Sequence, residues 1–430
     1  MKSGSTFLLA ARRCEIAELE ELARTGELVD AIGRFVHALQ RERGLSNVFL
    51  SSLGTRLGVQ RLEQVEECRR IEQQVRSQLE CLDAGARVRN GSRLFSAVAV
   101  VVHGLDGLDA LRERVAGQAL AAREATAAYS RLVTGLLAVV FEAADSATDP
   151  QISRALAALF NFMQGKEFAG QERALGAAAF AAGAIDVAGQ QHWRHLVESQ
   201  QGCFQAFAHF CRPGQLQADH AAHDPLVLAE IERLRRVGCG GAGTTLDTNL
   251  AQPWYAWCTR RIDAMREVED FLAVDLRRLC EARIAQARSE LRDQRAVLDA
   301  LAEAASRPDA TAAAPYGPHL ERSILAMVQE QSQRLQAMSE ELEAVRATLH
   351  ERKLVERAKG VLMAHRQMSE DEAYKALRRL AMNQNRKLSE VAQALLSLAE
   401  VLPGAPDPAH RTAAVHNAGT VPASPGTNER

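Results

Sequence analysis

The chain has 430 residues, a formal net charge of −2 at pH 7 and 25% charged side chains. This length predicts two or three structural units rather than one helical core. The near-neutral charge argues against a nucleic-acid binder that is basic over its whole surface.

The N-terminus shows no targeting signal. Its apolar run, Phe7–Ala11, is too short for the central region of a signal peptide. The longest apolar stretch, Leu132–Phe141, is about half of a membrane span. The eight cysteines are scattered without a CxxC pair, which is typical of reduced thiols in the cytosol rather than of a zinc site or a disulfide framework. We therefore expect a cytoplasmic protein with no membrane association, no metal and no other cofactor.

The residue pattern along the chain predicts helices almost throughout. Aromatic and β-branched runs are few, and Ala, Leu, Arg, Glu and Gln dominate. Residues 27–280 have the apolar spacing of successive amphipathic helices that form one large bundle. Breaks are expected near Gly85–Gly91, Asp145–Pro150, Pro213–Pro225 and Gly238–Pro253. An all-α fold follows.

Residues 281–332 are predicted to be a helical linker. A charged helix from Arg283 to about Ala304 precedes the segment Arg307–Pro318, whose three prolines predict a break. A second long helix begins near Leu320. Residues 401–430 are rich in proline and poor in large apolar side chains, so we expect this tail to be disordered.

Residues 333–400 are predicted to be a compact domain of three helices. The second helix has a capping box from Ser369 to Glu372, and Asn383–Asn385 marks its end. Between Glu351 and Lys387 there are ten Lys or Arg residues against five Asp or Glu, a local charge of +5. Such a run is usually a solvated helix face, and nucleic-acid binding is the alternative.

Three stretches of this domain resemble the ANTAR family. They are Arg357–Met363 with its Ala-Lys-Gly core, Ser369–Arg378 and Asn385–Ala392. ANTAR domains bind hairpins in leader transcripts and prevent terminator formation, so the resemblance implies leader mRNA hairpins as partners. A helical domain would read the accessible bases of hairpin loops rather than the deep A-form groove. The resemblance and the charge together give as RNA-contact candidates Lys353, Arg357, Lys359, Arg378, Arg386 and Lys387.

Three arginines of the N-terminal domain fall on apolar helical stripes. Arg43 continues the stripe of Leu28–Leu39, Arg261 lies within that of Trp254–Leu272, and Arg173 follows a less regular one. Burying an unpaired charge is costly, so each needs a carboxylate or a bound anion. Guanidinium groups suit a small planar oxyanion. From the residues alone, structural pairs are favoured, with carboxylates from Glu42, Glu172 and Glu267 as candidates.

Three further stretches resemble the NIT family, a helical module that senses nitrate and nitrite. They are Gln40–Ser46, Lys166–Ala174 and Trp257–Met265, in this order. The resemblance implies that nitrate or nitrite contacts Arg43, Arg173 and Arg261, with Arg260 the nearest competitor for the last position. Together with the ANTAR-like domain, it implies a nitrate-responsive antitermination regulator in which anion binding relieves inhibition of the RNA-binding domain. A homodimer is also expected.

Other functions stay open at this point. The N-terminal helices of a constitutive RNA-binding protein could serve dimerisation alone or sense a different small ligand. An enzyme is the weakest candidate, because no catalytic constellation is found. Gly238–Gly243 matches GxGxxG but lacks a preceding strand. The pairs His192/His195 and His220/His223 lack accompanying ligands, so no metal site is expected.

Overall fold

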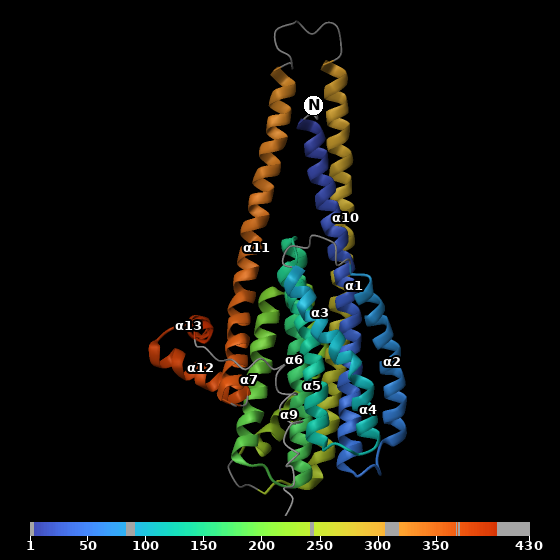
Figure 1. The fold of residues 1–430 in the computed structure, drawn as a ribbon, viewed down its shortest axis with the longest axis vertical. Coiled ribbons are helices and arrows are strands. Elements are labelled where there is room, and N and C mark those ends of the chain that lie inside the picture. The colour runs from blue at the N-terminus through green and yellow to red at the C-terminus, as the bar shows by residue number, and fades with distance from the viewer. Residues whose placement is uncertain are drawn as a thin grey trace, which may run out of the picture. The chain divides into compact units, whose positions relative to one another are not determined.

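The computed structural model describes residues 4–82, 91–240, 245–305, 318–366, 368 and 370–401. Every regular element in these ranges is helical, which confirms the expected all-α fold (Figure 1). The chain divides into two units, residues 1–349 and 350–430, and helix α11 belongs to both. The elements are α1 (Gly4–Ser51), α2 (Gly58–Glu80), α3 (Gly91–Asp106), α4 (Leu108–Ala116), α5 (Ala122–Ser146), α6 (Pro150–Ala182), α7 (Val187–Phe210), α8 (Pro213–Ala222), α9 (Pro225–Gly238), the 3-10 turn η1 (Thr248–Leu250), α10 (Ala251–Ala305), α11 (Pro318–Arg366), α12 (Glu370–Gln384) and α13 (Leu388–Val401).

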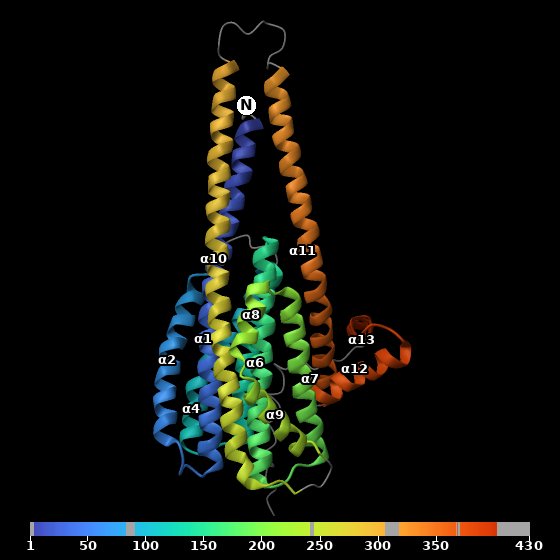
Figure 2. The same ribbon diagram turned by 180° about the vertical axis from the view of Figure 1, so that it is seen from behind.

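Helix α6 is the centre of the first unit. It lies beside α5, α7 and α10, while α1 packs on α2, α5 and α10 (Figures 1 and 2). Between Leu156 and Gly170 every residue of α6 except Gln164 is buried. A helix that is covered on all sides carries any charged residue of its middle turns into the core. Charged side chains of α6 therefore need partners from α1, α7 and α10.

The start of α6 is fixed by Asp149. Its side chain accepts hydrogen bonds of 3.0 Å from the backbone N–H groups of Gln151 and Ile152, and Pro150 occupies the first helical position. The other carboxylate oxygen of Asp149 accepts a 2.9 Å hydrogen bond from Nε of Arg283 on α10. The break expected between α5 and α6 is thus present, and Asp149 within it also bonds to α10.

Some helix boundaries differ from the sequence expectation. Helix α1 begins at Gly4, and α10 runs unbroken through residue 281, where a linker was expected to begin. The Pro213–Pro225 loop contains the ten-residue helix α8. The reason is that Pro213 and Pro225 each occupy the first turn of a helix, where proline lacks only an N–H group that would be unpaired anyway.

The second unit consists of the last turns of α11 with α12 and α13. Its core contains Leu354, Leu377 and Val391. Helix α12 ends at Gln384, where Asn385 adopts a left-handed φ of 48° and the N–H of the next residue bonds to the Ala381 carbonyl at 3.0 Å. The predicted capping box begins at Ser369, which lies outside the described residues.

Two helical stretches of the described residues, Gly91–Ala116 and Ala122–Ser146, are long and apolar enough to cross a membrane by composition. Core helices of soluble proteins meet the same criterion. Helix α5, the second stretch, packs between α1, α3 and α6 and contributes Tyr129, Val133 and Leu136 to the buried core. Its apolar character therefore has an explanation within the bundle.

Candidate functional site

Arg43 on α1 points into the seam between α1 and α6, where it meets a carboxylate. Its Nη1 lies 2.5 Å from Oε1 of Glu167, and its Nη2 lies 3.2 Å from Oε2. The exposed fractions are 3% for Arg43 and 1% for Glu167. Gln40 donates to Glu167 at 2.8 Å, and Ser130 accepts from Arg43 at 2.8 Å. The inward orientation expected from the apolar stripe is present, but the partner is Glu167 rather than Glu42.

Two glycines allow arginine side chains to enter this seam. A Cβ on Gly170 of α6 would lie 2.9 Å from Nη2 of Arg43, and a Cβ on Gly44 of α1 would lie 3.3 Å from Nη2 of Arg173. The first distance is shorter than real Cβ contacts, and the second is tight. Each helix thus supplies one arginine and the glycine against which the other helix's arginine lies. The structure therefore brings Arg43 and Arg173 to one helix crossing.

Arg173 is held by uncharged groups of α10. Its Nη1 donates to Oγ1 of Thr259 at 3.0 Å, and its guanidinium carbon lies 4.9 Å from the ring centroid of Tyr255. Within the described part of the chain, no carboxylate lies at ion-pair distance from Arg173. Its positive charge is therefore buried without a direct counter-charge, which is unfavourable unless an anion is nearby.

Arg261 on α10 is half-buried and also has no carboxylate at ion-pair distance among the described residues. Its Nη1 donates to Oε1 of Gln200 at 2.9 Å, while its Nε is buried with no hydrogen-bond partner among the described residues. Burial lowers the pKa of Arg261, the positive charge of Arg235 lowers it further, and Glu172 opposes both. A bound anion would favour the charged form of Arg261 and could accept from Nε.

A cavity of about 640 Å³ lies between the α8–α9 connection, α9 and α10. Arg261 lines it together with Thr259 and Tyr255, the two partners of Arg173. Both arginines also act on Cys258: burial raises the pKa of this thiol, whereas Arg261 and Arg173 lower it. The two guanidinium groups therefore approach the same region of α10.

Glu172 was one of the expected partners of the inward arginines, but it pairs with Arg235 of α9. Nε and Nη2 of Arg235 each donate to Glu172 at 2.7 Å. Trp193 and Gln200 add hydrogen bonds of 2.9 and 2.7 Å. Burial alone would raise the pKa of Glu172, but the bonds from Arg235 and Gln200 outweigh it and hold this pKa below its usual range. Glu172 is thus already neutralised, and Arg173 and Arg261 remain without their own carboxylate.

Sequence reasoning missed Glu167, Gln200 and Arg235. Glu167 lies inside one of the motif stretches, directly after Lys166, and this position was the available signal. Arg235 belongs to a basic run at the end of α9 that resembles an ordinary solvated helix end. Gln200 carries no charge and stood out in no pattern.

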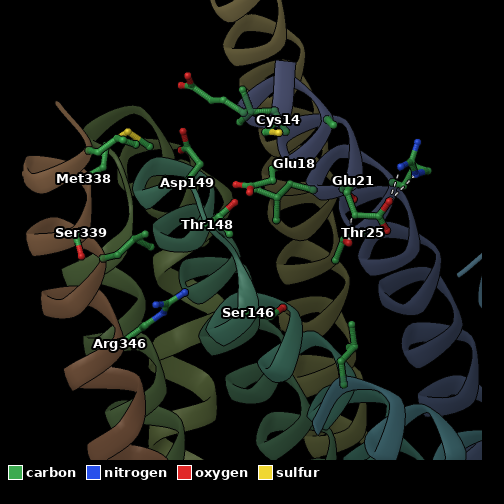
Figure 3. A pocket seen from close by; sticks show the side chains of 18 of the residues that line it. Cys14, Glu18, Glu21, Thr25, Ser146, Thr148, Asp149, Met338, Ser339 and Arg346 are labelled. Carbon is green, nitrogen blue, oxygen red and sulfur yellow. Dashed lines mark hydrogen bonds and ion pairs between the residues drawn. The ribbon is translucent and has the colours of Figure 1, made fainter. Parts of the chain in front are cut away.

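A second cavity of the first unit, about 710 Å³, lies between α1, the α5–α6 connection and α11 (Figure 3). Apolar side chains line it together with carboxylates of Glu18, Glu21 and Asp149. These carboxylates make it a poorer host for an anion than the arginine cluster. In the residues that the structure describes, no group of three or more His, Cys, Asp or Glu side chains is placed to hold a metal ion.

The RNA-contact candidates of the second unit differ in exposure. Lys353 is half-buried, and the exposed ones are Arg357, Arg378, Arg386 and Lys387. Arg386 donates to Glu390 at 3.1 Å, and Lys387 lies 3.8 Å from Glu351. Such exposed pairs contribute little to stability, so phosphate groups could replace the carboxylates.

Lys359 does not have the exposed position expected of an RNA contact, because only 5% of it is exposed. It follows Val355 by four residues and precedes Leu362 by three, and both of these pack against the core of the second unit. Residues at these spacings share one helix face. The low exposure of Lys359 therefore follows from its place on the packing face of α11.

Comparisons with known proteins match both units. A family model described as nitrate and nitrite sensing, the NIT family, matches residues 34–277, and a model of the ANTAR domain matches residues 343–396. A nitrate regulatory protein of Klebsiella oxytoca is 37% identical over 391 residues, which cover 90% of this chain and 93% of that protein. The solved structure of the NasR transcription antiterminator superposes with a TM-score of 0.59 at 33% identity, covering 92% of this chain and 99% of that one.

Proposed function

The chain belongs to the family in which a NIT domain precedes an ANTAR domain, and we propose that anion binding to its first unit controls RNA binding by its second. As a member of this family it is a nitrate-responsive regulator of transcription antitermination. In the proposal, residues 27–280 sense nitrate or nitrite, residues 281–332 connect, and residues 333–400 bind leader mRNA hairpins. The bound anion relieves inhibition of the RNA-binding domain.

One observation carries the sensor part of this proposal. Arg173 is buried and Arg261 is half-buried, and neither has a direct carboxylate among the described residues. Arg173 contacts Thr259 and Tyr255 of α10, and these two residues line the same cavity as Arg261. Arg43 enters the same bundle at the crossing that holds Arg173. Nitrate is a planar monoanion whose oxygens match the paired donors of a guanidinium group. We therefore propose Arg43, Arg173 and Arg261 as its ligands.

The RNA part of the proposal rests on the family and on the exposed charge. We propose Arg357, Arg378, Arg386 and Lys387 as contacts, with Lys353 at the edge of the surface. The chain is further proposed to act in the cytoplasm as a homodimer. Sedimentation analysis would test the dimer separately. A monomer at the concentrations of the binding experiments would refute the homodimer but not the proposed anion and RNA binding.

The test is isothermal calorimetry of the full-length chain with nitrate, nitrite, chloride and sulfate, paired with RNA binding by fluorescence anisotropy. Only a sensor couples the two ligands, so nitrate should tighten binding of a leader hairpin. RNA affinity that is independent of every anion would favour the constitutive RNA-binding protein instead.

Arg260 and Arg261 give a matched pair of variants. Arg260 is exposed and bonds to Asp224 at 2.9 Å, whereas Arg261 is half-buried, lines the cavity and bonds to Gln200 at 2.9 Å. Arg261→Ala should weaken nitrate binding by about 10- to 100-fold, the size expected when hydrogen bonds to a charged group are removed. Arg260→Ala should leave nitrate affinity unchanged. Equal effects of the two variants on nitrate affinity would show that Arg261 is not a nitrate ligand.

A further inference from the structure

We propose that Glu167 is an internal competitor of the effector: its carboxylate occupies the donors of Arg43 that nitrate requires, and nitrate binding displaces it. This inference rests on the proposed function and assigns to Glu167 the setting of anion affinity.

The contact between Glu167 and Arg43 has the form of a bound oxyanion. Two coplanar carboxylate oxygens meet two guanidinium nitrogens, Oε1 with Nη1 at 2.5 Å and Oε2 with Nη2 at 3.2 Å. Nitrate would present a pair of coplanar oxygens in the same way. Both groups cannot occupy these two donors of Arg43 together.

The surrounding donors would serve nitrate as well as they serve the carboxylate. Gln40 on α1 donates to Oε2 of Glu167 at 2.8 Å, and Gln171 on α6 donates to Oε1 at 2.9 Å. Both amides are neutral N–H donors, so they can bond to a free nitrate ion as well as to the carboxylate of Glu167. When Glu167 turns away, Arg43 and these two amides remain as a set of donors directed at one place.

The charges of the three candidate arginines are balanced unequally. Arg43 alone has a carboxylate at ion-pair distance, while Arg173 and Arg261 have only uncharged hydrogen-bond partners among the described residues. An anion at Arg173 or Arg261 therefore meets no carboxylate that it must displace, but contact with Arg43 requires Glu167 to leave. Two neighbouring anions also repel each other in a buried site, which favours this exchange.

The exchange links anion binding to the helix crossing. Glu167 is attached to α6 and Arg43 to α1, so their ion pair joins the two helices. Nitrate carries no covalent link to α6. Replacing Glu167 by nitrate therefore removes a direct tie between the helices and replaces it with a diffusible one.

The experiment compares nitrate affinities of the full-length wild type, Glu167→Gln and Glu167→Asp by calorimetry, with circular dichroism to establish folding. Glu167→Gln retains the shape but removes the competing charge, so nitrate should bind about tenfold or more tightly. Glu167→Asp keeps a carboxylate on a shorter arm, so Arg43 is not left without a counter-charge when the pair is lengthened. It should tighten nitrate binding by a smaller factor.

Glu42→Gln is the matched control. Glu42 is buried and accepts two hydrogen bonds from Arg112, at 3.0 and 3.1 Å, but it does not touch Arg43. This variant removes an equivalent charge from the adjacent position and should leave nitrate affinity unchanged.

The outcomes separate the inference from the proposed function. If the wild type binds nitrate and both Glu167 variants bind it equally or more weakly, Glu167 only positions Arg43 and the inference is overturned. Tightening by Glu42→Gln to the same extent would also overturn it, because the effect would then be one of general charge. A wild type without measurable nitrate binding would refute the proposed function, and the inference would fall with it.

Discussion

The guanidinium group of Arg43 lies against Gly170, with Nη2 2.9 Å from the position that a Cβ on this glycine would take. The added methyl group of Gly170→Ala would lie too close to this nitrogen, so the guanidinium group of Arg43 must move. Because Glu167 holds the same group, this movement also disturbs their ion pair. We expect this variant to weaken nitrate binding by about tenfold or more, because a displaced guanidinium group no longer presents its paired donors to the anion. Calorimetry on the folded variant is the measurement.

Two other glycines provide the comparison. A Cβ on Gly44 would lie 3.3 Å from Nη2 of Arg173, so Gly44→Ala should have a smaller effect than Gly170→Ala. Gly202 on α7 has open space around it, and Gly202→Ala should stabilise the helix by up to about 1 kcal/mol without any effect on nitrate. The same affinity in all three variants would show that the α1–α6 crossing is remote from the anion.

The inward arginines could be predicted from the sequence, whereas their partners could not. An arginine on an apolar stripe is visible in one helix, because the period of 3.6 residues identifies its face. Its carboxylate belongs to another helix: Glu167 lies 124 positions after Arg43. The neighbouring carboxylate of Glu42 is the natural candidate in the sequence, but consecutive residues of a helix point to different sides, and Glu42 faces Arg112 instead.

The helix boundaries and the exposure of the basic residues in the second unit could likewise not be predicted from the sequence alone. Helix type follows from composition, yet Pro213 and Pro225 suggest the ends of a loop although each begins a helix. Lys359 lies in a run of positive charge, and only the packing of the second unit shows that it faces inwards. Local pattern thus identifies the elements, while the partners of each charge require the tertiary arrangement.

Glu172 predicts a pH dependence of stability. Its pKa in the folded chain is lowered, against the effect of burial, by hydrogen bonds from Arg235 and Gln200. A lowered pKa contributes stability that is complete above the unfolded value of about 4.3 and is lost as the pH falls through the folded value. Glu172→Gln should therefore be less stable than the wild type at pH 7, by about 3 kcal/mol for a broken buried pair.

This difference should shrink as the pH falls below about 4.3, where the carboxylate of the unfolded wild type begins to be protonated. Urea unfolding followed by tryptophan fluorescence is a suitable measurement, because Trp193 is fully buried and bonds to Glu172 at 2.9 Å. A stability difference that stays constant from pH 7 to pH 3 would contradict the assigned role of Glu172.

Arg346 fastens α11 to the first unit. It donates to the backbone carbonyls of Asp145 at 3.2 Å and Ala147 at 3.0 Å, at the end of α5. Since α11 continues into the second unit, removal of this anchor should weaken the inhibition proposed above. We expect Arg346→Ala to bind a leader hairpin without nitrate about tenfold more tightly than the wild type, given two charged hydrogen bonds. Fluorescence anisotropy is the measurement.

The control for this variant is Gln336→Ala on the same helix. Gln336 is exposed, and its one hydrogen-bond partner among the described residues is Glu340 of α11 itself, so its replacement should leave nitrate-free RNA affinity unchanged. An Arg346→Ala chain that still requires nitrate as strongly as the wild type would show that this anchor plays no part in the inhibition.

Arg357 and Lys359 separate RNA binding from packing within one turn of α11. Arg357 is exposed and Lys359 is buried, although both belong to the same basic run. Removal of one phosphate-binding side chain should reduce the log–log dependence of RNA affinity on salt by about 0.7 for single-stranded segments. Arg357→Ala should therefore weaken RNA binding and lower this slope, while the melting temperature stays unchanged.

Lys359→Ala should lower the melting temperature and, where folded, retain the wild-type slope. Salt titrations of the nitrate-loaded chains, followed by anisotropy, measure both slopes. The reverse pattern, with a reduced slope for Lys359→Ala alone, would mean that the packing face opens to meet the RNA.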